Sequence, residues 1–144
     1  MNITIKENFN ADLHGFSGVA IDKNWGATGM KLMDKMWKEV RSKSLRNKGI
    51  NVWVYEAGDK MFAGVELEAP PGTGTELEFK KIHLIKYASY KHIGPYSKIG
   101  EACSKARDEM NQKGLRTCLP YLEIYGHWTE DESKLETDLL WCLE

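Results

Sequence analysis

A glutamate within an aromatic segment is the residue of this sequence with the clearest capacity for chemistry. Glu123 lies in LPYLEIYGHW, residues 119–128, with Tyr121 and Tyr125 two places before and after it. Side chains alternate between the two faces of a strand, so the carboxylate is expected to share a face with both phenol rings. A half-buried carboxylate without a partner is unfavourable, so it either takes up a proton or finds a cation.

An earlier segment, NVWVYEA at 51–57, carries aromatic residues in the same alternation. It places Trp53 and Tyr55 on one face and two valines on the other. Aromatic faces attract cations by about 0.5–2 kcal/mol each. A ring of Trp and Tyr around one Glu therefore suits a flat, apolar, positively charged organic molecule. The alternative is a glutamate that is exposed to solvent or paired with a lysine such as Lys86 or Lys91.

Two amphipathic helices are expected to position these strands. Apolar residues recur at spacings of three and four over about 28–44 and again over about 96–113. Pro95 suits the first turn of the second helix, and Gly114 suits the left-handed residue after its end. Gly49 is predicted to close the first helix in the same way.

The remaining segments are typical of short strands and turns. A Gly-Asp pair at 58–59 predicts a hairpin between NVWVYEA and KMFAGVELEA, and the Pro/Gly-rich APPGTGTE predicts a link at mid-chain. Later strands are expected in KKIHLIKYASYKHIG, PYLEIYG and ETDLLWCLE.

The order of strand, helix and hairpin occurs twice, at an offset of about 70 residues. Two copies are too few for a solenoid. We therefore expect one α+β domain over residues 1–144, with repeat halves of about 1–70 and 75–144. It should contain pseudo-twofold strand–helix–strand–strand units and an antiparallel sheet with two helices on one face. The offset places Trp53 opposite Glu123. The aliphatic positions are expected under the helices, with the aromatic residues and the glutamate on the other face.

Composition disfavours several classes of protein. The net charge is −1 and the basic residues are spread among acidic ones, so no basic stripe for nucleic acid is present. The N-terminal segment lacks the apolar run of a signal peptide, and no run is long enough to span a membrane. Cys103, Cys118 and Cys142 form no CxxC motif, so we expect no metal site, no cofactor, no disulfide framework and a cytoplasmic location.

Two other residues have a structural and a chemical interpretation. His92 and Tyr96 could form an acid–base pair, although His92 suits a structural position at a strand end. Cys103 lies on the apolar stripe of the second helix, so we interpret it as a core residue and not as a nucleophile.

The second half of the chain resembles the GyrI-like effector-binding domains. YKHIGPYSKIGEA, at 90–102, is similar to the family's aromatic strand, His-x-Gly-Pro-Tyr motif and helix. YLEIYG, a short acidic loop and ETDLLWCL match the rest, so the resemblance covers 87–143. WKEV and NVWVYEAGDKMFAGVELEA are similar to the family's first repeat. The family fold has two strand–helix–strand–strand units about a pseudo-twofold axis, which agrees with the repeat described above.

The resemblance implies a small-molecule site. Family members bind lipophilic organic cations or other small hydrophobic molecules, often as the sensing half of bacterial multidrug-responsive transcription regulators. The resemblance assigns the central glutamate and the pocket aromatics to Glu123, Trp53, Tyr55, Tyr96 and Tyr125, with Trp37 and Trp141 as further candidates. The last strand ends in WCLE where the family has Ile-Pro-Val, which leaves the role of Trp141 open.

Three roles follow from the resemblance. The first is a stand-alone binding protein without direct nucleic-acid or membrane contact, acting alone, as a homodimer or through a separate regulatory partner, because no helix-turn-helix is evident. The second is a hydrolase of reactive cyclopropane-bearing toxins, in which Glu123 would activate water and a pocket tyrosine such as Tyr125 would donate a proton. The third is a protein-interaction role, such as gyrase inhibition.

Overall fold

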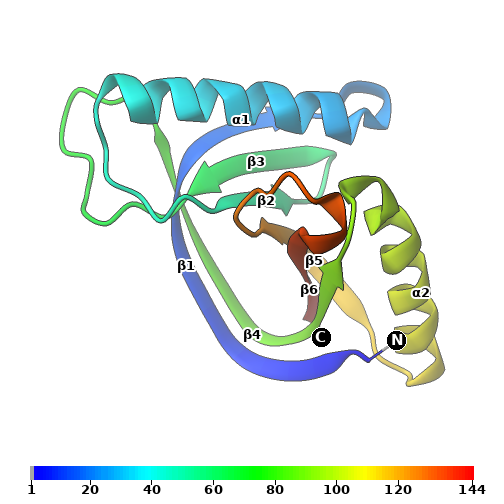
Figure 1. Cartoon of the computed structure of the whole chain (residues 1–144). Helices are drawn as coiled ribbons and strands as arrows, with labels where there is room; N and C mark the ends of the chain where they lie inside the picture. The colour runs from blue at the N-terminus through cyan, green and yellow to red at the C-terminus, as the bar shows by residue number, and fades with distance from the viewer. Residues whose placement is uncertain (1) are drawn as a thin grey trace.

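The computed structural model, which describes residues 2–144, contains two matching sets of elements (Figure 1). The elements are β1 (Thr4–Val19), α1 (Trp25–Ser42), β2 (Asn51–Tyr55), β3 (Lys60–Val65), β4 (Glu78–Ile93), α2 (Ile99–Gln112), β5 (Thr117–Tyr125) and β6 (Glu136–Leu143). Short 3-10 turns lie at Ile21–Lys23, Tyr96–Lys98 and Glu132–Lys134. The predicted duplication of strand–helix–strand–strand is confirmed, although α2 begins after the turn at 96–98 and not within it.

The ends of the helices follow from local capping. The side chain of Asn24 caps α1 by accepting a backbone N–H of the first turn at 3.4 Å. Gly114 follows α2 with a φ of +67°, as predicted. After α1 the equivalent left-handed residue is Ser44, whose N–H donates to the Arg41 carbonyl at 3.1 Å. The prediction that Gly49 closes this helix is therefore wrong, because Gly49 lies in the later connection to β2.

The six strands form one closed antiparallel sheet in the order β1-β3-β2-β5-β6-β4, with β4 returning to β1. The two long strands, β1 and β4, pair with each other and curve, so that β1 reaches β3 and β4 reaches β6 (Figure 1). Gly15 lies where β1 passes from β4 to β3. A Cβ at this position would lie 1.9 Å from the carbonyl oxygen of Ala63, so only glycine allows this approach.

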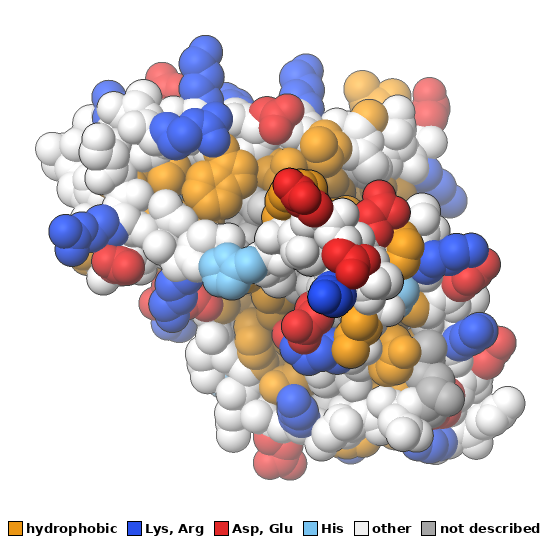
Figure 2. Space-filling view, viewed as in Figure 1, with side chains coloured by type: hydrophobic (Ala, Val, Ile, Leu, Met, Phe, Trp, Pro, Cys, Tyr) orange, Lys and Arg blue, Asp and Glu red, His pale blue; other side chains and the backbone are white. Residues whose placement is uncertain are grey.

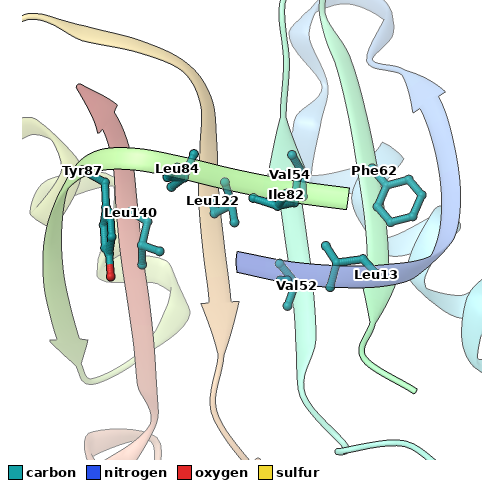
Figure 3. Packing of buried hydrophobic residues seen from close by; sticks show 10 residues of the cluster. Leu13, Val52, Val54, Phe62, Ile82, Leu84, Tyr87, Leu122 and Leu140 are labelled. Carbon is teal, nitrogen blue, oxygen red and sulfur yellow. The ribbon is translucent and has the colours of Figure 1, made fainter. Parts of the chain in front are cut away.

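The main aliphatic core lies inside the closed sheet (Figure 3). Val52 and Val54 of β2 pack there against Leu122 of β5 and Leu140 of β6. The prediction that these aliphatic positions lie under the helices is wrong. Because the sheet closes on itself, its inner faces cover one another and need no helix.

Both helices pack on the opposite face, the one that carries the aromatic residues. Leu32 and Met33 of α1 contact the cluster around Trp53, and α2 packs against Leu139 and Trp141 of β6. The expectation of two helices on one face is confirmed, but that face is the aromatic one. The site therefore lies between the helices.

Candidate functional site

Glu123 is buried, at 7% exposure, and is surrounded by tyrosine hydroxyls. Its Oε1 accepts hydrogen bonds from Tyr55 at 2.8 Å and from Tyr125 at 2.5 Å. Its Oε2 accepts one from Tyr121 at 2.8 Å. Trp53 is its direct partner on β2, as the repeat offset predicted. Both carboxylate oxygens are therefore held by neutral donors.

Strand geometry alone brings these groups together. Tyr121, Glu123 and Tyr125 are alternate residues of β5, so their side chains leave the same face. Tyr55 of β2 lies directly opposite Tyr121 in the register of the two strands. Opposite residues of an antiparallel pair share a face, which places the third hydroxyl beside the carboxylate.

The environment keeps these tyrosines protonated. Burial raises the pKa of Tyr55, Tyr121 and Tyr125 well above the ordinary value, and the negative charge of Glu123 raises each pKa further. A phenolate in this position would be both desolvated and next to a carboxylate. The three hydroxyls therefore remain hydrogen-bond donors across the physiological pH range.

The charge of Glu123 is not matched by a cation of the protein. Over residues 2–144, no ion pair joins Glu123 to a lysine, arginine or histidine. Lys91 instead pairs with Glu136 at 3.0 Å and with Asp138 at 3.5 Å. The alternative of an exposed or lysine-paired glutamate is thus contradicted. Among the described residues, the buried carboxylate has hydrogen-bond donors but no cationic partner.

A cavity of about 660 Å³ opens beside this carboxylate. Its volume lies within the range of about 300–1,000 Å³ that is usual for small-molecule sites. Its walls are mainly aromatic and apolar. The lining residues are Gly26, Met30, Met33, Gly49, Asn51, Trp53, Tyr55, Tyr96, Ile99, Glu123, Tyr125, Gly126 and Trp128.

Aromatic rings in the wall support one another edge to face. The ring of Tyr125 lies 5.4 Å from that of Trp53 and 5.5 Å from that of Tyr96. Tyr55 is held in the same way by Trp25, at 5.4 Å. These pairs fix the ring orientations, so the site is largely formed before a ligand binds.

Helix α1 approaches this wall through a glycine. A Cβ at Gly29 would lie 2.3 Å from the ring of Trp53, so the helix can lie this close only because Gly29 has no side chain. The indole N–H of Trp53 is buried and has no hydrogen-bond partner within the described chain. The indole ring of Trp53 is therefore held by packing alone.

Exposed apolar side chains border the cavity. Trp128 is 71% exposed, Met30 is 49% exposed and Tyr96 is 40% exposed, and all three line the cavity. In the space-filling view, apolar side chains reach the surface below α1 (Figure 2). Such exposure on a small domain is typical of a binding site.

The structure brings together most, but not all, of the site residues predicted from the sequence. Glu123, Trp53, Tyr55, Tyr96 and Tyr125 line the cavity. The other two predicted residues, Trp37 and Trp141, do not line it.

Both of these tryptophans lie behind the wall. The indole N–H of Trp37 donates to the side-chain oxygen of Asn51 at 2.6 Å, and Asn51 is a lining residue. Trp141 is 4% exposed and packs against Tyr121, with ring centroids 5.4 Å apart. Each therefore supports a residue of the site.

Sequence reasoning missed several residues of the site, among them Tyr121, Met30, Met33 and Trp128. Tyr121 was placed on the correct face but was not recognised as a partner of the glutamate. Met30 and Met33 lie on the predicted apolar stripe of α1, which gave no sign that part of this stripe faces a cavity. Trp128 lies in the loop after β5, where no periodicity could have indicated its role.

Two weaker candidates have structural roles. A ring nitrogen of His92 lies 3.0 Å from the carbonyl oxygen of Pro95, which confirms the interpretation of His92 as a strand-end residue. Cys103 packs in the cluster beneath α2, as predicted, and its Sγ lies 3.1 Å from the hydroxyl of Tyr121. Burial raises the pKa of this thiol, so it is not an activated nucleophile.

The described residues offer neither a metal centre nor a membrane-spanning helix. No group of three or more His, Cys, Asp or Glu side chains in 2–144 is placed to hold a metal ion. No helix in the same part of the chain is long and apolar enough to cross a bilayer.

Solved structures with the same fold include ligand-binding and hydrolytic proteins. The EcmrR C-terminal domain matches with a TM-score of 0.78 at 16% identity, over 99% of this chain and 97% of that one. SAV2435 bound to tetraphenylphosphonium matches with a TM-score of 0.65 at 15% identity, over 100% and 94%. A hydrolase from Listeria innocua matches with a TM-score of 0.60 at 11% identity, over 99% and 91%.

No protein-family model matches the chain, and no curated protein matches it significantly. At such identities the structural likeness concerns the fold. The chain adopts the fold of the GyrI-like effector-binding domains, as the resemblance of its sequence predicted.

Proposed function

We propose that this protein binds hydrophobic organic cations, aromatic ones in particular, in the cavity beside Glu123. The observation that carries the proposal is a buried carboxylate that faces an aromatic cavity and has only neutral hydrogen-bond donors among the described residues. A ligand cation would supply the missing positive charge. The same three hydroxyls would keep the carboxylate oriented toward the cavity before a ligand binds.

The energies available in the cavity suit micromolar binding. Two charges 4 Å apart attract by about 4 kcal/mol at an effective dielectric constant of about 20, and removal of both ions from water offsets part of this. Contact with the rings of Trp53 and Tyr125 adds about 0.5–2 kcal/mol each. A micromolar dissociation constant needs about −8 kcal/mol, which burial of apolar ligand surface can complete.

The apolar wall favours lipophilic cations over hydrated ones. Met30, Met33 and Ile99 line the cavity and offer no hydrogen bond to an ammonium group that is rich in N–H donors. Methionine side chains are flexible and polarisable, so this wall can adapt to several ligand shapes. A broad preference for delocalised aromatic cations follows. The cation bound by SAV2435, a protein of the same fold, supports this choice of ligand class.

We further propose that the protein acts in the cytoplasm as a small-molecule binding module. It would sequester or sense its ligand alone, as a homodimer or through a separate regulatory partner. The near-neutral charge, −1 overall, supports a role without direct nucleic-acid contact.

Titration with tetraphenylphosphonium tests the proposal, with tetraphenylborate as an anion of the same shape. Quenching of tryptophan fluorescence and isothermal calorimetry should both give a micromolar dissociation constant for the cation and no saturable binding of the anion. Equal affinity for the two ions, or no response to a broad panel of aromatic cations at tens of micromolar, would refute the proposal.

A hydrolase remains the second candidate, because a hydrolase shares the fold and the site pairs a carboxylate with tyrosines. Glu123 would take a proton from water as the water oxygen bonds to a strained cyclopropane carbon. Tyr125 would protonate the carbon released when the ring opens. We favour a binder, because three tyrosine hydroxyls already donate hydrogen bonds to Glu123, and only Oε2, which accepts a single one, has room to accept a water.

Mass spectrometry of a cyclopropane-bearing alkylating compound distinguishes the two candidates. A binder leaves the compound at its background rate of hydrolysis. Water addition well above background that is lost in Glu123→Gln would establish the hydrolase instead.

A further inference from the structure

Two cysteines that lie far apart in the sequence face each other across two neighbouring strands. Cys118 of β5 and Cys142 of β6 are direct partners in the antiparallel register. Two positions further along the same ladder, the N–H of Glu144 donates to the carbonyl of Arg116 at 2.9 Å. Because hydrogen-bonded and non-hydrogen-bonded pairs alternate, the cysteines also occupy a hydrogen-bonded position.

The spacing at such a position suits a covalent link. Cα atoms of a hydrogen-bonded antiparallel pair lie about 5.5 Å apart, and disulfides span Cα separations of about 4.4–6.8 Å. Cβ atoms of opposite residues lie about 4.5–5.5 Å apart, somewhat more than the roughly 3.8 Å that is typical of disulfides. A bond formed here would be under strain, and strained disulfides are the ones that are readily reduced.

The two thiols share one face and are within reach of small reagents. Cys142 packs at the edge of the core inside the sheet, and opposite residues point to the same side. Both side chains are half-buried, in contrast to the fully buried neighbours Leu122 and Leu140. Burial, and then contact with Cys118, raises the pKa of Cys142 to about 11. Cys142 therefore rests as a thiol at neutral pH and should react faster as the pH rises.

We propose that Cys118 and Cys142 form a reversible intramolecular disulfide, a modification site separate from the ligand cavity. No sequence motif indicated this pair, because only the register of β5 and β6 brings the two residues together. The proposal does not depend on the ligand-binding function.

A low-molecular-weight disulfide such as oxidised glutathione would supply the oxidant. The thiolate of Cys118 attacks one sulfur of the glutathione disulfide, which releases one glutathione thiolate and leaves a mixed disulfide. The thiolate of Cys142 then attacks the Cys118 sulfur and releases the second glutathione. The protein thiols lose two electrons and two protons, and the two glutathione molecules gain them.

The link would join β5, which carries Glu123 and two of its tyrosine partners, to the neighbouring strand β6. Glu123 lies opposite Leu139, and Tyr121 lies opposite Trp141, on the same pair of strands. The register shifts between Cys118 and Tyr121, so this part of β5 is irregular. A disulfide would hold the strand pair together at the end of this irregular stretch.

The test is oxidation of the folded, full-length protein with millimolar oxidised glutathione at pH 8, followed by alkylation and mass spectrometry. We expect two of the three cysteines to be protected, a mass lower by two hydrogens, and a cross-linked peptide that contains Cys118 and Cys142. Dithiothreitol should restore all three thiols. Cys118→Ser and Cys142→Ser should each leave the remaining cysteine of the pair as a glutathione adduct.

Three results would overturn the proposal. The first is accumulation of glutathione adducts on the wild-type protein without a cross-link. The second is a cross-link that involves Cys103. The third is a folded protein that retains three free thiols under conditions that oxidise the same protein in urea.

Discussion

Replacement of Gly29 by alanine tests how closely α1 is held against the cavity wall. The added methyl group would lie 2.3 Å from the Trp53 ring, far inside van der Waals contact. Trp53 has little room to retreat, because it is 7% exposed and its ring packs edge to face against Tyr125. Either the helix or the indole must therefore move.

Gly26, in the first turn of the same helix, provides a matched control. An added Cβ there meets no atom within 4 Å. Both substitutions gain up to about 1 kcal/mol of helix propensity. Overpacking of a filled core typically destabilises by about 1–3 kcal/mol. The free energy of unfolding of Gly29→Ala should therefore be lower than that of Gly26→Ala by about 1–3 kcal/mol.

Urea unfolding monitored by circular dichroism measures this difference directly. The two variants should differ in the midpoint of unfolding and share the same slope, because the surface exposed on unfolding is unchanged. Gly26→Ala should be at least as stable as the wild type. Equal stability of the two alanine variants would refute the close contact between α1 and Trp53, and with it the account of how this wall is held.

Three further predictions concern the ring of tyrosines and the mouth of the cavity. Tyr125→Phe should lower the free energy of unfolding by about 1.5–3 kcal/mol in urea titrations, because it removes a hydrogen bond to a carboxylate. Tyr90→Phe is the control and should change this free energy little, because the Tyr90 hydroxyl makes no hydrogen bond to another residue within 2–144. Trp128→Ala should weaken the binding of aromatic cations by about 0.5–2 kcal/mol in calorimetry, because it removes one aromatic face from the cavity. The free energy of unfolding should not fall, because the Trp128 side chain is 71% exposed. Burial raises the pKa of Tyr55 and Tyr121 in the folded protein above the ordinary value of 10.0. The unfolded chain therefore loses these protons first, so the free energy of unfolding is unaffected below pH 10 and falls as the pH rises above it. Absorbance titration should show these phenols ionising only as the protein unfolds, and their ionisation in the folded protein near pH 10 would contradict their burial.

Local features made most of the fold predictable. Helical periodicity, the hairpin turn at 58–59 and the left-handed Gly114 all depend on short stretches of chain, and each is present in the structure. The repeat offset also predicted the pairing of Trp53 with Glu123, because the two copies use equivalent strand positions. Alternation along β5 then placed Tyr125 beside the carboxylate.

Closure of the sheet was the feature that the sequence did not predict. Alternation shows which residues share a face, but it does not show whether that face turns inward or meets a helix. The curvature of β1 and β4 decides this, and it depends on contacts between distant segments, such as the approach of Gly15 to Ala63. For the same reason the sequence did not show that Met30 would face a cavity or that Trp141 would lie behind one.

The central claim is that Glu123 recognises the positive charge of a ligand. Glu123→Gln keeps the shape of the side chain and removes its charge. Glu136→Gln is the matched control, because this substitution makes the same change in charge on the surface. The Glu136 side chain is 52% exposed, pairs with Lys91 and lies outside the cavity lining.

The most direct measurement is the affinity of the wild type and both variants for tetraphenylphosphonium and tetraphenylborate by isothermal calorimetry. A buried charge-assisted contact contributes roughly 1.5–3 kcal/mol, so Glu123→Gln should lower the affinity for the cation by about tenfold to a hundredfold. The same variant should leave the anion unaffected or bind it better, and Glu136→Gln should match the wild type with both ions. Tetraphenylphosphonium that binds Glu123→Gln as tightly as the wild type would contradict the claim that this carboxylate recognises charge.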